Sequence, residues 1–284
     1  MTAARPVVWL NDRIVDPDAA SVHWSDHGLT VGDGVFETLK VVDGTPFALR
    51  RHLDRLRHSA SGLGVTPPGD DQLRAAVDAV AQLLEAPLAR LRITVTGGPG
   101  PMGSSRGSDG PTLLVTAQPI PQPDGGPTAV ITVPFTRNPT SAVAGLKTTS
   151  YAENVVALAR AEAASASEAL LANTRGELCE GTGSNVFVGV GGQLLTPGLD
   201  SGCLAGITRE LVLEALAAAG TEVVVTTLQF GVLQEADEVF LTSSTRDVQS
   251  VRSVDGVALP SYPGPLTVLA ARVFAATYEH RVDP

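Results

Sequence analysis

The chain offers only two side-chain amines for chemistry. Of its 20 basic residues, Lys40 and Lys147 alone are lysines. Lys147 lies in AVAGLKTTSYAEN, between apolar residues and a small polar turn, just ahead of a helix-forming stretch. A lysine in this setting is either a surface residue with its ammonium in water or an amine held in a pocket. A desolvated lysine loses its proton readily, which is what Schiff-base chemistry requires.

Three further segments supply groups that suit one cofactor. Glu180, in ELCEGTGSNVFV, is either an ordinary loop acid or a carboxylate that keeps a pyridinium nitrogen protonated, as in enzymes of pyridoxal 5′-phosphate (PLP). Gly206-Ile207-Thr208 opens a strong helix, and the free N–H groups at such an end suit a phosphate. The strand in DEVFLTSSTRD ends in the hydroxyl residues 242–245. Together they indicate an amine, a ring-nitrogen partner and a phosphate site.

The first third of the chain reads as mixed strand and helix. Residues 35–49 contain two strand-like runs joined by Asp43-Gly44, a dipeptide typical of hairpin turns. A leucine stripe at helical spacing follows, and Arg55 is turned away from it. In LARLRITVTGG the apolar residues share one face of a predicted strand, so Arg92 lies on the polar face.

A change of composition divides the chain. Residues 97–110 predict an irregular loop, and PIPQPDGGP at 119–127 has the makeup of an interdomain linker. We therefore expect a small α/β domain over 1–118 and a larger domain over 128–284. The larger domain offers strands at TAVITVP, EALLANT, NVFVGV, QLLTP, EVVVTT and DEVFLTS, with helices near 152–166, 206–219 and 265–278. The expected fold class is α/β in two domains.

Composition argues against several classes of function. The net charge is −10 and no basic face is visible, which argues against binding nucleic acid. No apolar run approaches the roughly 18 residues of a membrane span, and the N-terminus does not resemble a secretory signal. Two cysteines, Cys179 and Cys203, cannot form a disulfide framework, which favours the cytoplasm. The five histidines have no companions at zinc spacing, so no metal site is expected.

Six blocks in fixed order carry a family resemblance. They are GDGVFETLKVVDG (32–44), HLDRL (52–56), AGLKTTSY (144–151), CEGTGSNVF (179–187), LAGITRE (204–210) and DEVFLTSS (237–244). From about residue 8 to residue 255 the chain resembles the fold-type IV PLP enzymes: branched-chain aminotransferases, D-amino acid aminotransferases and aminodeoxychorismate lyases. The resemblance implies a small N-terminal α/β domain, a larger β-barrel-like C-terminal α/β domain, PLP as cofactor and a homodimer.

The resemblance also implies roles for single residues. Lys147 would be the catalytic Schiff-base lysine, and Glu180 the partner of the pyridine nitrogen. Tyr151 would touch the phenolic oxygen of PLP, although the tyrosine of branched-chain members lies one residue further from the lysine. The phosphate would be bound by Arg55, Ile207, Thr208, Ser243 and Ser244. Without the resemblance, Arg55 reads more readily as an ordinary solvated helix residue.

Substrate recognition departs from the pattern of the family. D-amino acid members typically hold the substrate carboxylate with a tyrosine, an arginine and a histidine, whereas the aligned positions here are Phe36, Met102 and Ser104. Phe36 resembles the branched-chain members, but Val31 stands where they carry a tyrosine. The lyases share the RNP at 137–139 and need little beyond the lysine, so the sequence does not exclude a lyase.

Two arginines could bind the substrate carboxylate instead. Arg92 lies on the polar face of the strand that leads into the loop 97–110, and Arg106 lies within that loop. A planar guanidinium binds a carboxylate through two bonds, but either arginine could instead pair with a surface acid. The sequence thus predicts a PLP-dependent transaminase acting on a small-molecule amino donor and a 2-oxo acid, with D-amino acids or (R)-amines favoured as donors. Aminodeoxychorismate lyase and branched-chain L-amino acid aminotransferase are the alternatives.

Overall fold

The chain folds into two compact units. The computed structural model describes residues 5–122, 125–280 and 282–284. The first unit comprises 5–122, 146–151 and Asp283, and the second comprises the other described residues. The division after Gln122 falls within the linker expected at 119–127, of which residues 123 and 124 lie outside the described residues. The sequence prediction gave 146–151 to the larger domain, whereas its contacts place it with the first unit.

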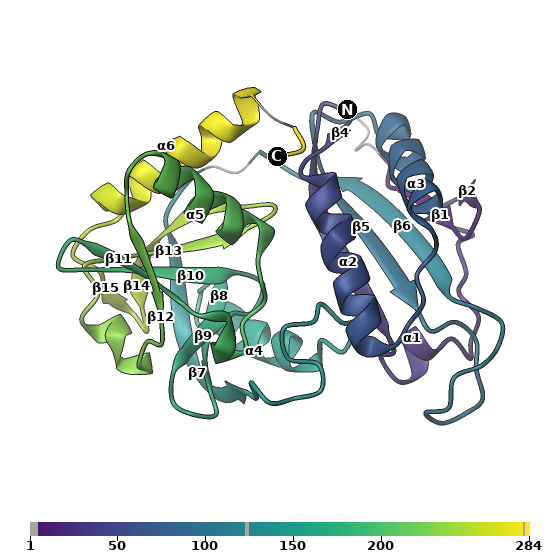
Figure 1. The fold of residues 1–284 in the computed structure, drawn as a ribbon, viewed down its shortest axis with the longest axis horizontal. Coiled ribbons are helices and arrows are strands. Elements are labelled where there is room, and N and C mark those ends of the chain that lie inside the picture. The colour runs from purple at the N-terminus through teal and green to yellow at the C-terminus, as the bar shows by residue number, and fades with distance from the viewer. Residues whose placement is uncertain (1–4, 123–124, 281) are drawn as a thin grey trace. The chain divides into compact units, whose positions relative to one another are not determined.

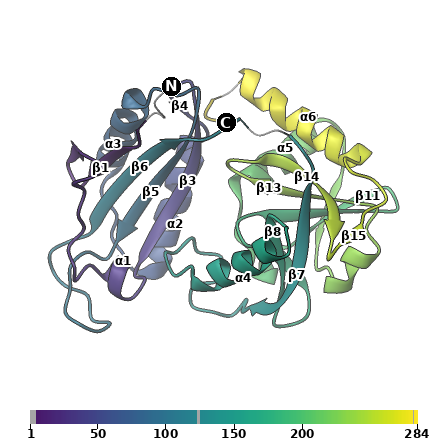
Figure 2. The same ribbon diagram turned by 180° about the vertical axis from the view of Figure 1, so that it is seen from behind.

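The first unit is an antiparallel sheet whose one face is covered by helices, as both views show (Figures 1 and 2). The strand order is β2-β1-β6-β5-β3-β4. The strands are β1 (Val7–Leu10), β2 (Arg13–Val15), β3 (Gly34–Val42), β4 (Thr45–Pro46), β5 (Leu88–Thr96) and β6 (Thr112–Pro119). The covering helices are α2 (Leu49–Leu63) and α3 (Asp70–Leu83), and the short α1 (His27–Thr30) precedes β3.

Side-chain periodicity accounts for these elements. Asp43 and Gly44 adopt φ of 46° and 76°, the positive values that a tight hairpin between β3 and β4 requires. Leu53 and Leu56 of α2 pack fully buried into the same core as Leu91 of β5. The apolar face of β5 is thereby used by the core, which leaves its other face, with Arg92, for other contacts.

The second unit is a mixed sheet that curls on itself (Figure 2). Its order is β12-β11-β10-β13-β14-β7-β8-β9, with β15 on β14. The strands are β7 (Thr128–Arg137), β8 (Glu168–Asn173), β9 (Leu178–Gly181), β10 (Asn185–Val190), β11 (Gln193–Pro197), β12 (Val223–Thr226), β13 (Glu238–Ser243), β14 (Asp247–Val254) and β15 (Val257–Ala258). The helices are α4 (Ala152–Ala163), α5 (Ile207–Ala218), α6 (Pro265–His280) and the short η1 (Leu199–Ser201) and η2 (Phe230–Gln234). Among the described residues, no helix has the length and apolar character needed to cross a bilayer.

Three strands of the second unit were not predicted from the sequence. β9 is four residues long and carries Glu180, which the sequence places only beside a turn; the turn follows at 182–184. β14 contains polar residues such as Gln249 and Arg252, which hide its alternation, and β15 has two residues. Short or polar strands give weak periodic signals, so their existence depends on pairing with neighbours.

Candidate active site

The backbone of Lys147 is fixed within the first unit by β3 and α2. The N–H of Phe36 donates to the carbonyl of Lys147 at 3.0 Å, and the N–H of Thr149 donates to the carbonyl of Gly34 at 2.8 Å. On the other side, the N–H of Lys147 donates to Oγ of Ser59 in α2 at 3.1 Å. The segment therefore runs beside the start of β3, and the lysine side chain leaves from a backbone held on both sides.

Aromatic rings surround the Lys147 amine. Its Nζ lies 4.3 Å from the ring centre of Phe36 and 5.9 Å from that of Tyr151. The two rings meet edge to face, with centroids 5.2 Å apart and an interplanar angle of 83°. Attraction between a cationic amine and aromatic faces holds the amine in place. Two residues expected at the site, Phe36 and Tyr151, thus contact the lysine, whereas Lys40 is buried near Phe47.

A buried carboxylate orients Arg55, the expected phosphate ligand. Arg55 donates from Nε to Oε1 of Glu37 at 2.8 Å and from Nη2 to Oε2 at 2.6 Å. Nδ1 of His52 lies 2.6 Å from the same Oε2. Burial alone would raise the pKa of Glu37, but Arg55 and His52 outweigh it and lower the pKa to about 2. Burial also lowers the pKa of His52.

Sequence reasoning assigned no role to Glu37 or His52. A signal was present, because His52 and Arg55 are three residues apart on a helix and so lie on one face. Glu37 is fully buried and accepts from Arg55 through both carboxylate oxygens, which fixes the orientation of that guanidinium.

The two candidate substrate arginines differ in what they bind. The guanidinium carbon of Arg92 lies 3.6 Å from the ring centre of Phe36, and its Nε donates to Oγ1 of Thr94 at 3.1 Å. Among the described residues, no acceptor contacts its Nη1 or Nη2. Burial lowers the pKa of Arg92. A partly buried guanidinium with two unused nitrogens is suited to an anionic ligand.

Arg106 is occupied by the protein itself. It donates from Nε and Nη2 to the two carboxylate oxygens of Asp33 at 2.6 and 2.7 Å. Nη2 also donates to the carbonyl of Leu63, and Nη1 to that of Gly64. All three nitrogens are engaged, so Arg106 ties the loop 97–110 to α2 and is the weaker candidate for substrate.

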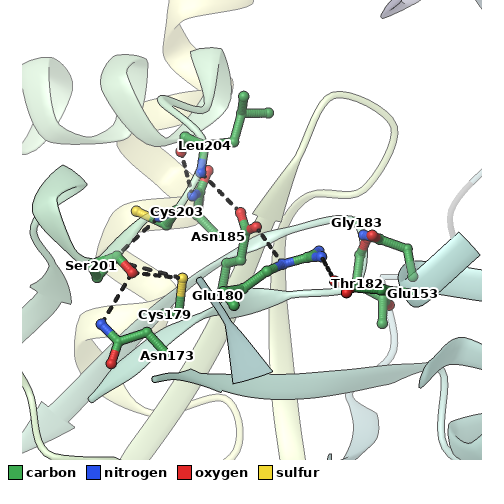
Figure 3. Close-up of polar contacts among 12 residues, drawn as sticks. Glu153, Asn173, Cys179, Glu180, Thr182, Gly183, Asn185, Ser201, Cys203 and Leu204 are labelled. Atoms are coloured by element: carbon green, nitrogen blue, oxygen red, sulfur yellow. Dashed lines mark hydrogen bonds and ion pairs between the residues drawn. The ribbon is translucent and has the colours of Figure 1, made fainter. Parts of the chain in front are cut away.

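In the second unit, Glu180 is anchored through both carboxylate oxygens (Figure 3). Oε2 accepts from the N–H of Leu204 at 3.0 Å, and Oε1 accepts from Nε of Arg137 at 3.2 Å. Arg137 belongs to the RNP run, and sequence reasoning gave it no role at the site. The Glu180 side chain keeps 13% of its surface exposed, so these bonds orient the carboxylate without enclosing the side chain completely.

Two cysteines are sequence neighbours of Glu180 and of its backbone donor Leu204. Cys179 directly precedes Glu180 in the chain. Cys203 directly precedes Leu204, whose N–H donates to the Glu180 carboxylate. Figure 3 shows both thiols near Ser201; Sγ of Cys179 lies 3.4 Å from the Ser201 carbonyl. Burial raises the pKa of both thiols, which keeps them neutral and poor nucleophiles.

The start of α5 lies close to β10. A Cβ on Gly206 would be 1.8 Å from Oδ1 of Asn185, so only glycine permits this approach. Within the described chain, no side chain caps the helix, and its first N–H groups, including those of Ile207 and Thr208, remain for a ligand. The side chains of both residues are buried, so their contribution to a phosphate site would come from the backbone.

Buried hydroxyl groups lie beside this helix end. Asn185 pairs with Thr242 across β10 and β13, which brings the end of β13 next to Gly206. Oγ1 of Thr242, a residue only 2% exposed, and Oγ of Ser243 have no hydrogen-bond partner among the described residues. A buried hydroxyl without a partner costs about 1–3 kcal/mol, and phosphate oxygens would satisfy such groups. Ser244 follows, half-buried. This donor set fits a phosphate group.

Comparison with known proteins identifies the family of the chain. A model of the family described as amino-transferase class IV matches residues 34–254. A Methanocaldococcus jannaschii protein provisionally named as a branched-chain-amino-acid aminotransferase is 36% identical over 257 residues, 88% of each chain. A Mycobacterium tuberculosis protein named bifunctional aminodeoxychorismate lyase / D-amino acid transaminase is 29% identical over 277 residues, 90% of this chain and 94% of its own.

A solved structure is similar over nearly the whole chain. The PLP-bound form of a hypothetical aminotransferase from Mycobacterium tuberculosis superposes with a TM-score of 0.83 at 28% identity, and the match covers 96% of this chain and 98% of that one. The expected two-domain α/β fold is thereby confirmed. The names of the relatives cover different reactions, so similarity alone leaves the substrate open.

Proposed function

The chain belongs to the class IV aminotransferase family, which is PLP-dependent, and from this premise we propose that it transfers an amino group between an amino acid and a 2-oxo acid. PLP, when bound, accepts the electron pair left when a bond at the substrate α-carbon breaks. The amine of Lys147 would hold the cofactor and then move the proton that leaves that carbon. Glu180 would bind the pyridine nitrogen, and Tyr151 the phenolic oxygen. The phosphate would be held by Arg55, Ser243, Ser244 and the N–H groups of Ile207 and Thr208.

One observation carries the proposal. The ring of Phe36 has the Lys147 amine 4.3 Å from its centre and the Arg92 guanidinium 3.6 Å from its centre. An amino acid has an amine-bearing carbon and a carboxylate joined by one bond, and a transaminase must hold both. Lys147 would act on the amine-bearing carbon. Nη1 and Nη2 of Arg92, which have no acceptor among the described residues, would bind the carboxylate. Phe36 holds the two cations in place and contacts the substrate.

We favour D-amino acids, and (R)-amines without a carboxylate, as donors. Val31 stands in place of the tyrosine expected in branched-chain members, and a relative of nearly equal length is named for D-amino acid transamination. The opposing indication is the M. jannaschii relative, whose provisional name makes an L-branched-chain donor the main competitor.

A lyase is the second candidate, because the same bifunctional relative is also named aminodeoxychorismate lyase. Removal of pyruvate from that substrate would use Lys147 as the proton carrier and would need no second substrate. The two reactions therefore differ in their need for a 2-oxo acid.

The test is to mix the PLP-loaded protein separately with D-alanine, L-leucine and aminodeoxychorismate and to follow the cofactor absorbance. We expect D-alanine to convert the cofactor to its aminated form and a 2-oxo acid to restore it. Conversion by L-leucine alone would identify a branched-chain enzyme. Pyruvate formed from aminodeoxychorismate without a 2-oxo acid would identify a lyase.

We also propose that the protein acts as a homodimer in the cytoplasm, as the family resemblance and the sparse cysteines imply. Light scattering of the PLP-loaded protein tests the first statement, and fractionation of cells tests the second.

A further inference from the structure

Helix α2 has a second stripe of residues beside the leucine stripe that packs into the core. The members of this second stripe are three or four residues apart, so they share one side of the helix: His52, Arg55, Ser59 and Gly62. At one end of the stripe, the histidine and the arginine contact Glu37 of β3. At the other end, the serine and the glycine lie against residues 146–151. One side of α2 therefore meets both the partner of the expected phosphate ligand and the segment that carries the lysine.

Ser59 makes the contact in this stripe that bears on the reacting amine. It is completely buried, and its Oγ accepts from the N–H of Lys147 at 3.1 Å. The carbonyl of Lys147 accepts from the N–H of Phe36 at 3.0 Å. Peptide groups are planar, so these two bonds fix the groups on either side of the Lys147 Cα. The direction in which the lysine side chain leaves the backbone is thereby set by α2 and β3 together.

Gly62 shows how closely α2 approaches this segment. A Cβ added at Gly62 would lie 2.8 Å from both Cδ1 and Cδ2 of Leu146, closer than packed carbon atoms allow. Glycine and serine are both poorer helix formers than alanine, so neither residue is explained by the stability of α2 alone. The glycine permits the approach, and the approach brings the Ser59 hydroxyl within reach of the peptide group between Leu146 and Lys147.

We propose that Ser59 is a positioning residue for the Lys147 amine. The inference rests on the proposed function, in which Lys147 holds the cofactor and carries the proton. Arg55, the phosphate ligand of that proposal, precedes Ser59 by about one helical turn, so a single stiff helix sets the spacing between the phosphate ligand and the lysine backbone. A group transfers a proton efficiently only at hydrogen-bond distance, so a small displacement of the amine slows the reaction. Ser59 acts through the backbone of Lys147.

The test compares Ser59→Ala, which removes the acceptor, with Ser61→Ala as the matched control. Ser61 lies on the same helix, is exposed, and its side chain makes no hydrogen bond to any other described residue. The same substitution at both positions raises helix propensity alike, so the two variants differ in the contact with Lys147. Both are prepared as PLP-loaded proteins, and urea unfolding measures their stability.

Two readouts report the placement of the amine. The near-visible circular dichroism of the bound cofactor, divided by its absorbance, depends on how the cofactor is oriented and needs no substrate. We expect this ratio to fall in Ser59→Ala by more than the control differs from the unaltered protein. The second readout is the single-turnover rate with an amino donor that converts the cofactor. At saturating donor the rate should fall roughly threefold to tenfold, as expected for one lost hydrogen bond, while the donor concentration for half-maximal rate changes less than about twofold, because Arg92 is unaltered.

Ser59→Thr keeps the hydroxyl and should restore both readouts nearly to those of the unaltered protein. A Ser59→Ala variant that is less stable but unchanged in both readouts would make Ser59 a structural residue only and overturn the proposal. Equal changes in Ser61→Ala, or a threonine variant that behaves like the alanine variant, would overturn it as well. Failure of the proposed function is seen in the unaltered protein itself, as cofactor reduced onto Lys40 or as a cofactor that no donor converts. In the second case the dichroism still tests Ser59.

Discussion

Each unit holds a carboxylate against an arginine, but the two differ in what they leave open. In the first unit, Glu37 is completely buried and receives two hydrogen bonds from Arg55 beside His52. In the second unit, Glu180 receives one bond from Arg137 and one from the N–H of Leu204, and 13% of its side chain stays exposed. Protein groups enclose Glu37 completely, whereas part of the Glu180 side chain stays exposed.

The difference separates positioning from catalysis. An enclosed carboxylate with a pKa near 2 stays ionised and can only orient its partners, so Glu37 acts through Arg55. A carboxylate that is anchored but still accessible can bind a ligand cation without reorganising, as preorganised sites require. Substitutions at Glu37 should therefore affect mainly stability, and those at Glu180 mainly turnover.

The largest effect is expected at Lys147, the proposed reacting amine, which belongs to the first unit. Lys147→Ala should reduce turnover to background and abolish the near-visible absorbance of bound cofactor, because no other amine of the described residues contacts Phe36 and Tyr151. Borohydride reduction followed by peptide mapping should label Lys147 in the unaltered protein. Lys40→Ala is the control, with its stability measured because Lys40 is buried, and it should keep the absorbance band. Cofactor fixed on Lys40 would contradict the whole assignment.

Glu180→Gln tests the accessible carboxylate. The amide keeps the shape but cannot stabilise a protonated ring nitrogen, so turnover should fall at least about a hundredfold, roughly 3 kcal/mol of transition-state stabilisation. PLP should remain bound, because Lys147 and the phosphate donors are unchanged. Absorbance reports cofactor content, and steady-state kinetics report kcat. Near-normal kcat in a PLP-loaded variant would make Glu180 a loop acid.

Glu37→Gln tests the enclosed carboxylate. Removal of one partner from a buried charge cluster should lower the free energy of unfolding by about 3 kcal/mol at pH 7. The folded pKa of about 2 lies below the ordinary 4.5, so the stabilisation is complete above about pH 4.5 and is lost as the pH falls toward 2. Urea unfolding across this range should show the gap between variant and unaltered protein narrowing as the pH falls. A gap that stays constant with pH would show that the Glu37 charge does not stabilise the fold.

Regular patterns made part of this structure predictable. The hairpin at Asp43-Gly44, the helix over 49–63 and the strand around Arg92 follow from turn chemistry and periodicity, and the structure contains all three. The assignment of 146–151 to the first unit could not be predicted, because it depends on backbone pairing between Lys147 and Phe36, which are far apart in the chain.

The site divides in the same way. Lys147 and Glu180 stand in recognisable motifs, but Glu37 and Arg137 gain their roles from ion pairs between distant strands and helices. A sequence shows that a charge exists and does not show whether a partner encloses it. Burial and pairing, which decide whether a charge orients or binds, appear only in three dimensions.

Two arginines of the first unit repeat the contrast between enclosed and accessible groups on a smaller scale. All three guanidinium nitrogens of Arg106 donate hydrogen bonds to Asp33 or to the carbonyls of residues 63 and 64. Nη1 and Nη2 of Arg92, in contrast, have no acceptor among the described residues. If accessibility again marks the binding group, Arg92 recognises substrate and Arg106 holds the loop. Variants at both positions therefore form a matched pair.

Arg92→Ala should raise the KM for amino acids and 2-oxo acids together by roughly tenfold to a hundredfold, because a lost charge-assisted pair typically costs about 1.5–3 kcal/mol. Simple (R)-amines have no carboxylate, so their kcat/KM as donors should change little. Arg106→Ala should lower the melting temperature and affect both donor classes alike, since it loosens the loop 97–110 without removing a substrate contact. Steady-state kinetics with D-alanine and an (R)-amine, on proteins of equal PLP content, separate the two outcomes. Equal losses for both donors in Arg92→Ala would show that Arg92 supports the fold around Phe36 and does not bind the carboxylate.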